Sequence, residues 1–86
     1  MYDLFLTEEA RHYYDHAETP LAKKLNRCFE QIQTDPYKHP NIKRLKGRLA
    51  GYLRYRVGDW RVVYAVDDQA KRITVLIIAH RSRVYE

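Results

Sequence analysis

The sequence contains one cysteine, three glycines, three prolines and no long hydrophobic run. A single thiol, Cys28, excludes a disulfide within the chain and fits a reducing compartment. No apolar stretch reaches the length of about 18 residues that a membrane span needs. The segment 1–6 lacks the basic and apolar regions of a signal peptide. These absences predict a cytoplasmic protein with no membrane partner.

Metal-ligating residues are also sparse. His12 and His16 stand four residues apart on an expected helix, but no third ligand accompanies them at a spacing typical of a metal site. We therefore expect both histidines to be solvated, and we expect no metal and no cofactor.

The remaining composition is that of one small folded domain. The chain has 86 residues, 45% of them hydrophobic and 13% aromatic, which is enough apolar material to form a core. There are no internal repeats, linkers or low-complexity stretches. We expect a single domain over residues 1–86.

Charge is distributed unevenly along the chain. Residues 1–35 carry seven acidic groups against four basic ones, whereas residues 38–61 carry eight basic groups against Asp59 alone. Such a basic stripe indicates a partner that is a nucleic acid or another polyanion. The alternative is a solvated surface, which suits the loop positions better than the arginines that alternate along a strand. The basic residues of the stripe are Lys38, Lys43, Arg44, Lys46, Arg48, Arg54, Arg56 and Arg61.

The segment 51–66 predicts a tight β-hairpin. Gly58-Asp59 is a favoured two-residue turn, and it would place Arg56 directly opposite Arg61. Because side chains alternate between faces, one face would be apolar and the other would carry arginines. Like charges opposite one another destabilise a sheet, so the arginine face is a candidate anion site. The apolar face would hold Leu53, Tyr55, Val57, Trp60, Val62 and Tyr64, and the arginine face Arg54, Arg56 and Arg61.

The segments around the hairpin complete the fold. A short strand over 2–6 precedes a helix capped by Thr7, and a second helix would start with Thr19 as cap and Pro20 at its first position. That second helix carries one apolar stripe, in which Cys28 is expected to be a packed residue. A loop then runs to about Gly47. The stripe comprises Leu21, Leu25, Cys28, Phe29 and Ile32.

A last strand over 72–79 is apolar on both faces, as in the centre of a sheet. The expected fold is α+β, with an N-terminal helical hairpin packed on one face of a small, largely antiparallel sheet in the order β-α-α-β-β-β. The helices would cover the apolar face of the hairpin and leave the arginine face uncovered.

Three segments together resemble the RelE-type toxins of the RelE/ParE superfamily: 45–47, 52–64 and 80–85. The resemblance covers essentially the whole chain and implies a RelE-like toxin of a type II toxin–antitoxin system. It implies a metal-independent endoribonuclease that cleaves mRNA in the ribosomal A site, leaving 2′,3′-cyclic phosphate and 5′-OH ends. The implied partners are the ribosome, mRNA and a RelB-like antitoxin, with a toxin–antitoxin heterotetramer as one assembly.

The resemblance also implies roles for individual residues. Members of the family often carry lysine where this chain has Arg54 and Arg56, and arginine is a far poorer proton acceptor. The tyrosine that stacks on or assists at the scissile nucleotide corresponds to Tyr85, and His80 is a further candidate. The implied catalytic residues are Arg56, Arg61, Arg81, Tyr85 and His80, and the implied RNA-binding residues are Lys43, Arg44, Lys46, Arg48, Arg54 and Arg83.

The residue types suit metal-free RNA cleavage, but they leave the proton transfers open. Arginines can clamp phosphate oxygens with paired hydrogen bonds and stabilise a charged transition state. Either Tyr85 or neutral His80 could accept the 2′-OH proton. Two other functions fit the same fold: a ParE-like, non-nucleolytic inhibitor of DNA gyrase, and a catalytically inactive module that binds RNA or an antitoxin.

Overall fold

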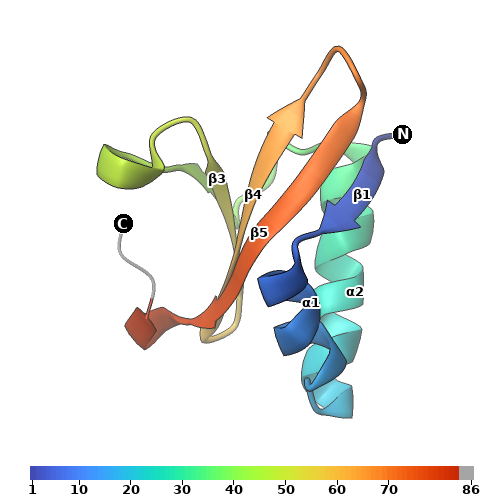
Figure 1. The fold of residues 1–86 in the computed structure, drawn as a ribbon, viewed down its shortest axis with the longest axis vertical. Coiled ribbons are helices and arrows are strands. Elements are labelled where there is room, and N and C mark those ends of the chain that lie inside the picture. Colours follow the sequence, from blue (N-terminus) through green and yellow to red (C-terminus); the bar gives the residue numbers. More distant parts are fainter. Residues whose placement is uncertain (84–86) are drawn as a thin grey trace.

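The computed structural model describes residues 1–83, which form two helices and a five-stranded sheet. Figure 1 shows both helices on one side of the sheet, which confirms the predicted α+β fold. The strand order is β1-β5-β4-β3-β2, with β1 parallel to β5 and the other pairs antiparallel. The elements are β1 (Asp3–Leu6), α1 (Glu8–Asp15), α2 (Thr19–Thr34), β2 (Ile42–Arg44), β3 (Leu53–Val57), β4 (Trp60–Asp67) and β5 (Arg72–His80), with short 3₁₀ helices at η1 (Gly47–Leu49) and η2 (Arg81–Arg83).

The helix boundaries largely follow the predicted signals. Thr7 caps α1, and its Oγ1 accepts a hydrogen bond from the backbone N of Ala10 at 3.2 Å. The predicted cap of α2 was wrong by one residue, because Thr19 is already helical and extended Glu18 precedes it. Pro20 still lies in the first turn, where its missing N–H costs no hydrogen bond. No helix in residues 1–83 has the length and apolarity needed to cross a membrane.

The core lies between α2 and the sheet. Leu25, Cys28, Phe29 and Ile32 of the predicted stripe are buried, and Leu21 is half-buried against the same core. Burial raises the pKa of the Cys28 thiol, which keeps it protonated and confirms its expected role as a packing residue. The sheet side of the core comprises Leu53, Tyr55, Val57, Val62, Tyr64, Ile73, Val75 and Ile78.

One strand was not predicted. The segment expected to be a loop up to Gly47 contains β2, which adds to the free edge of β3 by pairing Ile42 with Tyr55 and Arg44 with Leu53. The order β-α-α-β-β-β was therefore wrong by one strand. With only three residues, β2 has too little alternation to read from sequence, and its pairing to β3 defines it.

The added strand changes the environment of Arg54. This side chain is only 4% exposed, and its Nη1 donates a hydrogen bond to the backbone O of Asn41, just before β2, at 3.2 Å. Leu45 and Val63 are also buried, and the sheet registers place Val63 on the same face as Arg54. The expectation of an uncovered arginine face is therefore wrong for Arg54, which is part of the sheet's packing, whereas Arg56 on the same face is exposed.

A carboxylate joins three segments that are distant in sequence. Asp68, in the β4–β5 turn, accepts hydrogen bonds from the hydroxyls of Tyr2 and Tyr37, the latter at 2.6 Å. These bonds lower the pKa of Asp68, and the bond to Asp68 is the main cause that raises the pKa of Tyr37 to about 12. The turn is thereby tied to the N-terminus and to the segment after α2.

We expect Asp68→Ala to lower the melting temperature slightly at pH 7, by an amount that shrinks in acid. Because the pKa of Asp68 is lower in the folded chain, its ionised form stabilises the fold above the usual carboxylate pKa of about 3.9. This stabilisation is lost as the pH falls through the folded-state value. Thermal melts from pH 3 to pH 7 would measure the difference, with Asp3→Asn on β1 as control. A difference from wild type that does not change with pH would contradict this origin.

We expect Arg54→Ala to destabilise the fold more than Arg56→Ala does. Loss of the buried Arg54 guanidinium leaves the Asn41 carbonyl without that donor and opens space in the sheet, at a cost of about 1–3 kcal/mol. Exposed Arg56 should change the unfolding free energy by less than about 0.5 kcal/mol. Urea unfolding of both variants measures this difference. Equal, small effects would show that Arg54 does not hold the sheet together.

Candidate functional site

The predicted hairpin register is confirmed. Val57 pairs with Trp60, Arg56 with Arg61 and Tyr55 with Val62. Gly58 sits in the turn with φ +59, a conformation that glycine adopts without strain and that a two-residue turn requires. The turn therefore puts Arg56 and Arg61 side by side on the face of the sheet that does not carry the main core.

Arg81 is brought to the same end of the sheet by the backbone. Its N–H donates to the carbonyl O of Asp59 at 2.7 Å, which fixes the start of η2 against the β3–β4 turn. Its side chain is 66% exposed, and its Nε lies 3.9 Å from an Asp59 carboxylate oxygen. We call Arg54, Arg56, Arg61 and Arg81 together the arginine cluster.

The four guanidinium groups are close enough to affect one another. The pKa of Arg61 is lowered first by burial and then by the charges of Arg54, Arg56 and Arg81. The pKa of Arg54 is lowered by burial and by Arg56. These lowered pKa values do not remove the positive charge of Arg54 or Arg61 near neutral pH, because a guanidinium loses its proton only in strong base. An anion placed among them would relieve this repulsion.

A small cavity adjoins the cluster. It has a volume of about 160 Å³ and is lined by Pro40, Asn41, Lys43, Arg54 and Arg56. Lys43 pairs with Arg54 across β2 and β3, so its side chain shares the face of the cluster. Three cationic residues thus surround a space that could hold one phosphate group.

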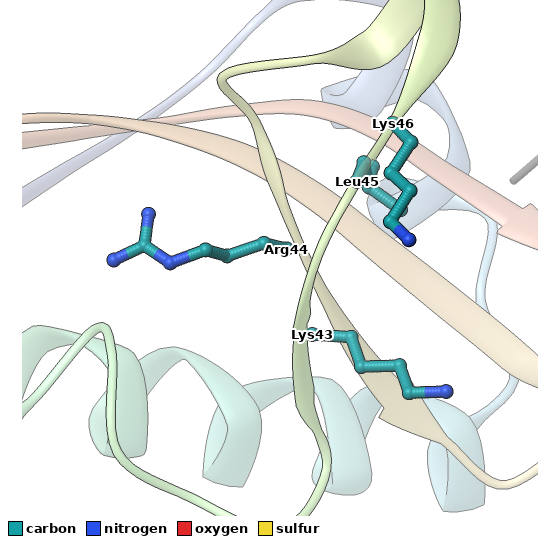
Figure 2. Close-up of a pocket in the computed structure, with 4 residues that line it drawn as sticks. All are labelled: Lys43, Arg44, Leu45 and Lys46. Carbon is teal, nitrogen blue, oxygen red and sulfur yellow. The ribbon is translucent and has the colours of Figure 1, made fainter.

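Lys43, Arg44, Lys46 and Arg48, also predicted to bind RNA, are exposed but do not all point the same way. Lys43, Arg44 and Lys46 line a shallow cavity of about 330 Å³ beside β2. Figure 2 shows Arg44 pointing away from the two lysines. The Arg44 guanidinium lies 5.7 Å from the centroid of the Tyr37 ring, on the helix side of the sheet. Arg48 is exposed on η1. Lys43 therefore extends the arginine cluster, whereas Arg44 does not.

His80 lies apart from the arginines. Its cross-strand partner is Trp60, so both side chains belong to the helix side, and their rings make an edge contact at 5.7 Å. A β-bulge between Val63 and Tyr64 in the pairing with β5 causes this placement, because it shifts the alternation of β5 by one residue. The structure thus does not bring His80 together with Arg61.

The remaining predicted site residues can be placed only in part. Tyr85 lies outside the described residues, and of Arg83 only the backbone is described, in η2. Within residues 1–83 no group of three or more His, Cys, Asp or Glu side chains could hold a metal ion. The role of Asn41, whose backbone carbonyl accepts a hydrogen bond from Arg54, was not predicted, because β2 next to it leaves no readable pattern in the sequence.

Comparison with protein families confirms the resemblance. The family model described as "ParE toxin of type II toxin-antitoxin system, parDE" matches residues 5–85. Toxin RelE of Mycobacterium tuberculosis (strain ATCC 25618 / H37Rv) is 46% identical over 43 residues, which cover 50% of this chain and 44% of that protein. The matched stretch thus spans less than half of that relative's length.

Solved structures share the fold over nearly the whole chain. A YoeB/ParE toxin from Agrobacterium tumefaciens superposes with a TM-score of 0.83 at 23% identity, covering 91% of this chain and 96% of that one. The toxin–antitoxin complex RelBE2 from Mycobacterium tuberculosis superposes with a TM-score of 0.79 at 26% identity, covering 93% of this chain and 98% of that one. The archaeal RelE-RelB complex from Pyrococcus horikoshii OT3 superposes with a TM-score of 0.81 at 20% identity, covering 96% of this chain and 98% of that one. With a family model matching almost its full length, the chain belongs to the ParE toxins of type II toxin–antitoxin systems, within the RelE/ParE superfamily.

Proposed function

We propose that this toxin is a metal-independent endoribonuclease that cleaves mRNA in the ribosomal A site. The observation that carries the proposal is the arginine cluster, with Arg56 opposite Arg61 and Arg81 held at the adjacent turn. Like charges in this arrangement are unfavourable without an anion, and RNA supplies anionic phosphates.

The reaction can be written with the groups that RNA itself provides. The 2′-OH loses its proton to a base and attacks the adjacent phosphorus, and the bond from phosphorus to the 5′-oxygen breaks as that oxygen gains a proton. The products are a 2′,3′-cyclic phosphate and a 5′-OH. Arg56, Arg61 and Arg81 would bind the phosphate oxygens and stabilise the extra charge of the transition state.

The proton acceptor is assigned to Tyr85, on the family resemblance. His80 was the other candidate, but it faces the helix side with Trp60, and no described contact joins it to the arginine cluster. Arg81, whose side chain is 66% exposed, is the candidate donor near the leaving oxygen.

A second candidate is a ParE-like toxin that inhibits DNA gyrase without cutting nucleic acid. The description of the matching family, which names ParE toxins, favours it. In that function the arginine cluster would bind an acidic protein surface. Only the ribonuclease needs Arg61 and Arg81 to act on one phosphate, so their contribution to RNA cleavage separates the two candidates.

We also propose that a RelB-like antitoxin binds this chain in the cytoplasm and covers Lys43 and the arginine cluster. Related toxins are found in complexes with RelB and YefM, one of them a heterotetramer from Staphylococcus aureus. An acidic segment of the antitoxin would match Lys43 and the arginine cluster in charge. A toxin–antitoxin heterotetramer is proposed for this chain as well.

We expect the purified protein to cut mRNA in a translating extract, and Arg61→Ala and Arg81→Ala each to reduce the rate by about 10²-fold or more. Removing either group removes charge that stabilises the transition state. Primer extension maps the cuts. Fragments should become ligatable at the 3′ end only after the cyclic phosphate is removed, and activity should survive a chelator of transition metals that spares the magnesium of the ribosome.

The matched control is Arg27→Ala, an exposed arginine on α2, which should cleave like the parent. Gyrase supercoiling is assayed in parallel. If the cleavage rate falls by less than threefold in both Arg61→Ala and Arg81→Ala, the catalytic site lies elsewhere. Inhibition of gyrase without RNA cleavage would favour the ParE-like function, and neither activity would indicate an inactive binding module.

Tyr85 is tested with two variants. Tyr85→Phe keeps the ring, whereas Tyr85→Ala removes ring and hydroxyl. If the hydroxyl takes the proton, both variants should lose activity equally, by roughly 10²–10⁴-fold. If only the ring matters, Phe keeps activity and Ala loses the stacking, worth ~1–3 kcal/mol per base. Single-turnover cleavage rates distinguish these cases, and two fully active, folded variants would refute the assignment.

A further inference from the structure

A groove lies at the C-terminal end of β5, on the helix side of the sheet and next to Arg81. β1 pairs with β5 only as far as Val75, so the rest of β5 has no strand neighbour on that side, and α1 packs there instead. Figure 1 shows this end of β5 beside the β3–β4 turn, to the left of α1. The groove has a volume of about 410 Å³ and is lined by Tyr13, Trp60, Ala79, His80 and Ser82; we call it the Trp60 groove.

The lining consists mainly of rings. Trp60 is half-buried and packs against the core, so its ring is held in place, and the His80 ring meets it edge-on. Tyr13 contributes a third ring from α1. Polar groups stand beside them, since His80 Nδ1 lies 3.1 Å from Ser82 Oγ. Flat aromatic surfaces with a few polar groups at the edge suit a planar, polar-edged ligand.

Three consecutive residues link the groove to Arg81, the one member of the arginine cluster next to it. His80 and Ser82 line the groove, and Arg81 between them belongs to the cluster. An adjoining cavity of about 290 Å³ shares Trp60 and His80 with the groove, and it is also lined by Asp59, whose carbonyl binds the Arg81 backbone. A ligand with a phosphate on Arg81 could therefore place its next flat group in the groove.

We propose that the Trp60 groove binds a nucleobase that flanks the cleaved phosphate of single-stranded RNA. This inference rests on the proposed function and adds a site for substrate choice. Proteins bind unpaired bases by stacking them on aromatic rings and by hydrogen bonds to their edges. Tyr13 and Trp60 would supply the stacking surface, and His80 and Ser82 the edge contacts. His80 thus acts in positioning the substrate and not in proton transfer.

A binding experiment tests the groove without cleavage. Trp60 is the only tryptophan of the chain, so its fluorescence reports on the groove directly. Trinucleotides whose 2′-OH groups are methylated cannot be cut and serve as probes. We expect saturable quenching of Trp60, and a dissociation constant raised about fivefold or more by Tyr13→Leu and by His80→Ala. Phe5→Leu, which removes an exposed ring from β1, should change nothing.

The folding of each variant is checked by its thermal melt. If Tyr13→Leu does not fold, Ser82→Ala replaces it in the test, because Ser82 also lines the groove and is exposed. The sequences at the cuts give a second measurement: Ser82→Ala and His80→Ala should redistribute cleavage among sites, whereas Arg61→Ala should slow cleavage at all of them.

The outcomes separate this inference from the proposed function. If labelled RNA binds but Trp60 does not respond, and the groove variants bind and cut like the parent, the groove proposal is wrong while the ribonuclease stands. If no RNA binds at all, the groove proposal is wrong, whereas the ribonuclease is judged by cleavage in the translating extract. If a protein partner shifts the Trp60 emission and RNA does not, the groove is a protein-docking site and the proposal is overturned.

Discussion

The register of one hairpin determines the arrangement of the functional surface. The two-residue turn at Gly58 sets Arg56 opposite Arg61 and sends Trp60 to the other side. A slip of one residue would exchange the faces, burying arginines under the helices and exposing the apolar row. The turn also offers the Asp59 carbonyl that holds Arg81 in place. The same short segment thus positions the arginine cluster and one wall of the Trp60 groove.

The cluster is tolerated because the opposite face of the sheet is well packed. A like-charge pair across two strands costs roughly 0.2–1 kcal/mol. Fully burying one aliphatic or aromatic side chain gains about 1.5–3 kcal/mol, and Val62 and Tyr64 are both completely buried within β4 alone. The packed face therefore outweighs the repulsion by a wide margin. Charge can accumulate on the other face without unfolding the domain, which leaves it available for an anionic partner.

What the sequence predicted depended on local signals. The hairpin register, the Thr7 cap and the α2 stripe follow from turn chemistry and periodicity, and each is seen in the structure. The burial of Arg54 could not be read, because it needs β2, a strand defined by pairing with distant residues. The side of the sheet on which His80 lies could not be predicted for a similar reason. Its strand is apolar on both sides, so no alternation in the sequence reveals the bulge that reverses it.

The chemistry of the arginine cluster also bears on why such a toxin would act on a ribosome. Guanidinium groups stabilise negative charge, but they do not accept protons near neutral pH. Arg54 is partly withdrawn into the sheet and holds Asn41, so fewer groups act on the phosphate than the sequence suggests. A site that supplies charge and little proton transfer gains most from a substrate already held in a reactive geometry. A ribosome that holds the mRNA in the A site would provide that geometry, and this is the chemical argument for the ribosome-dependent cleavage that we propose.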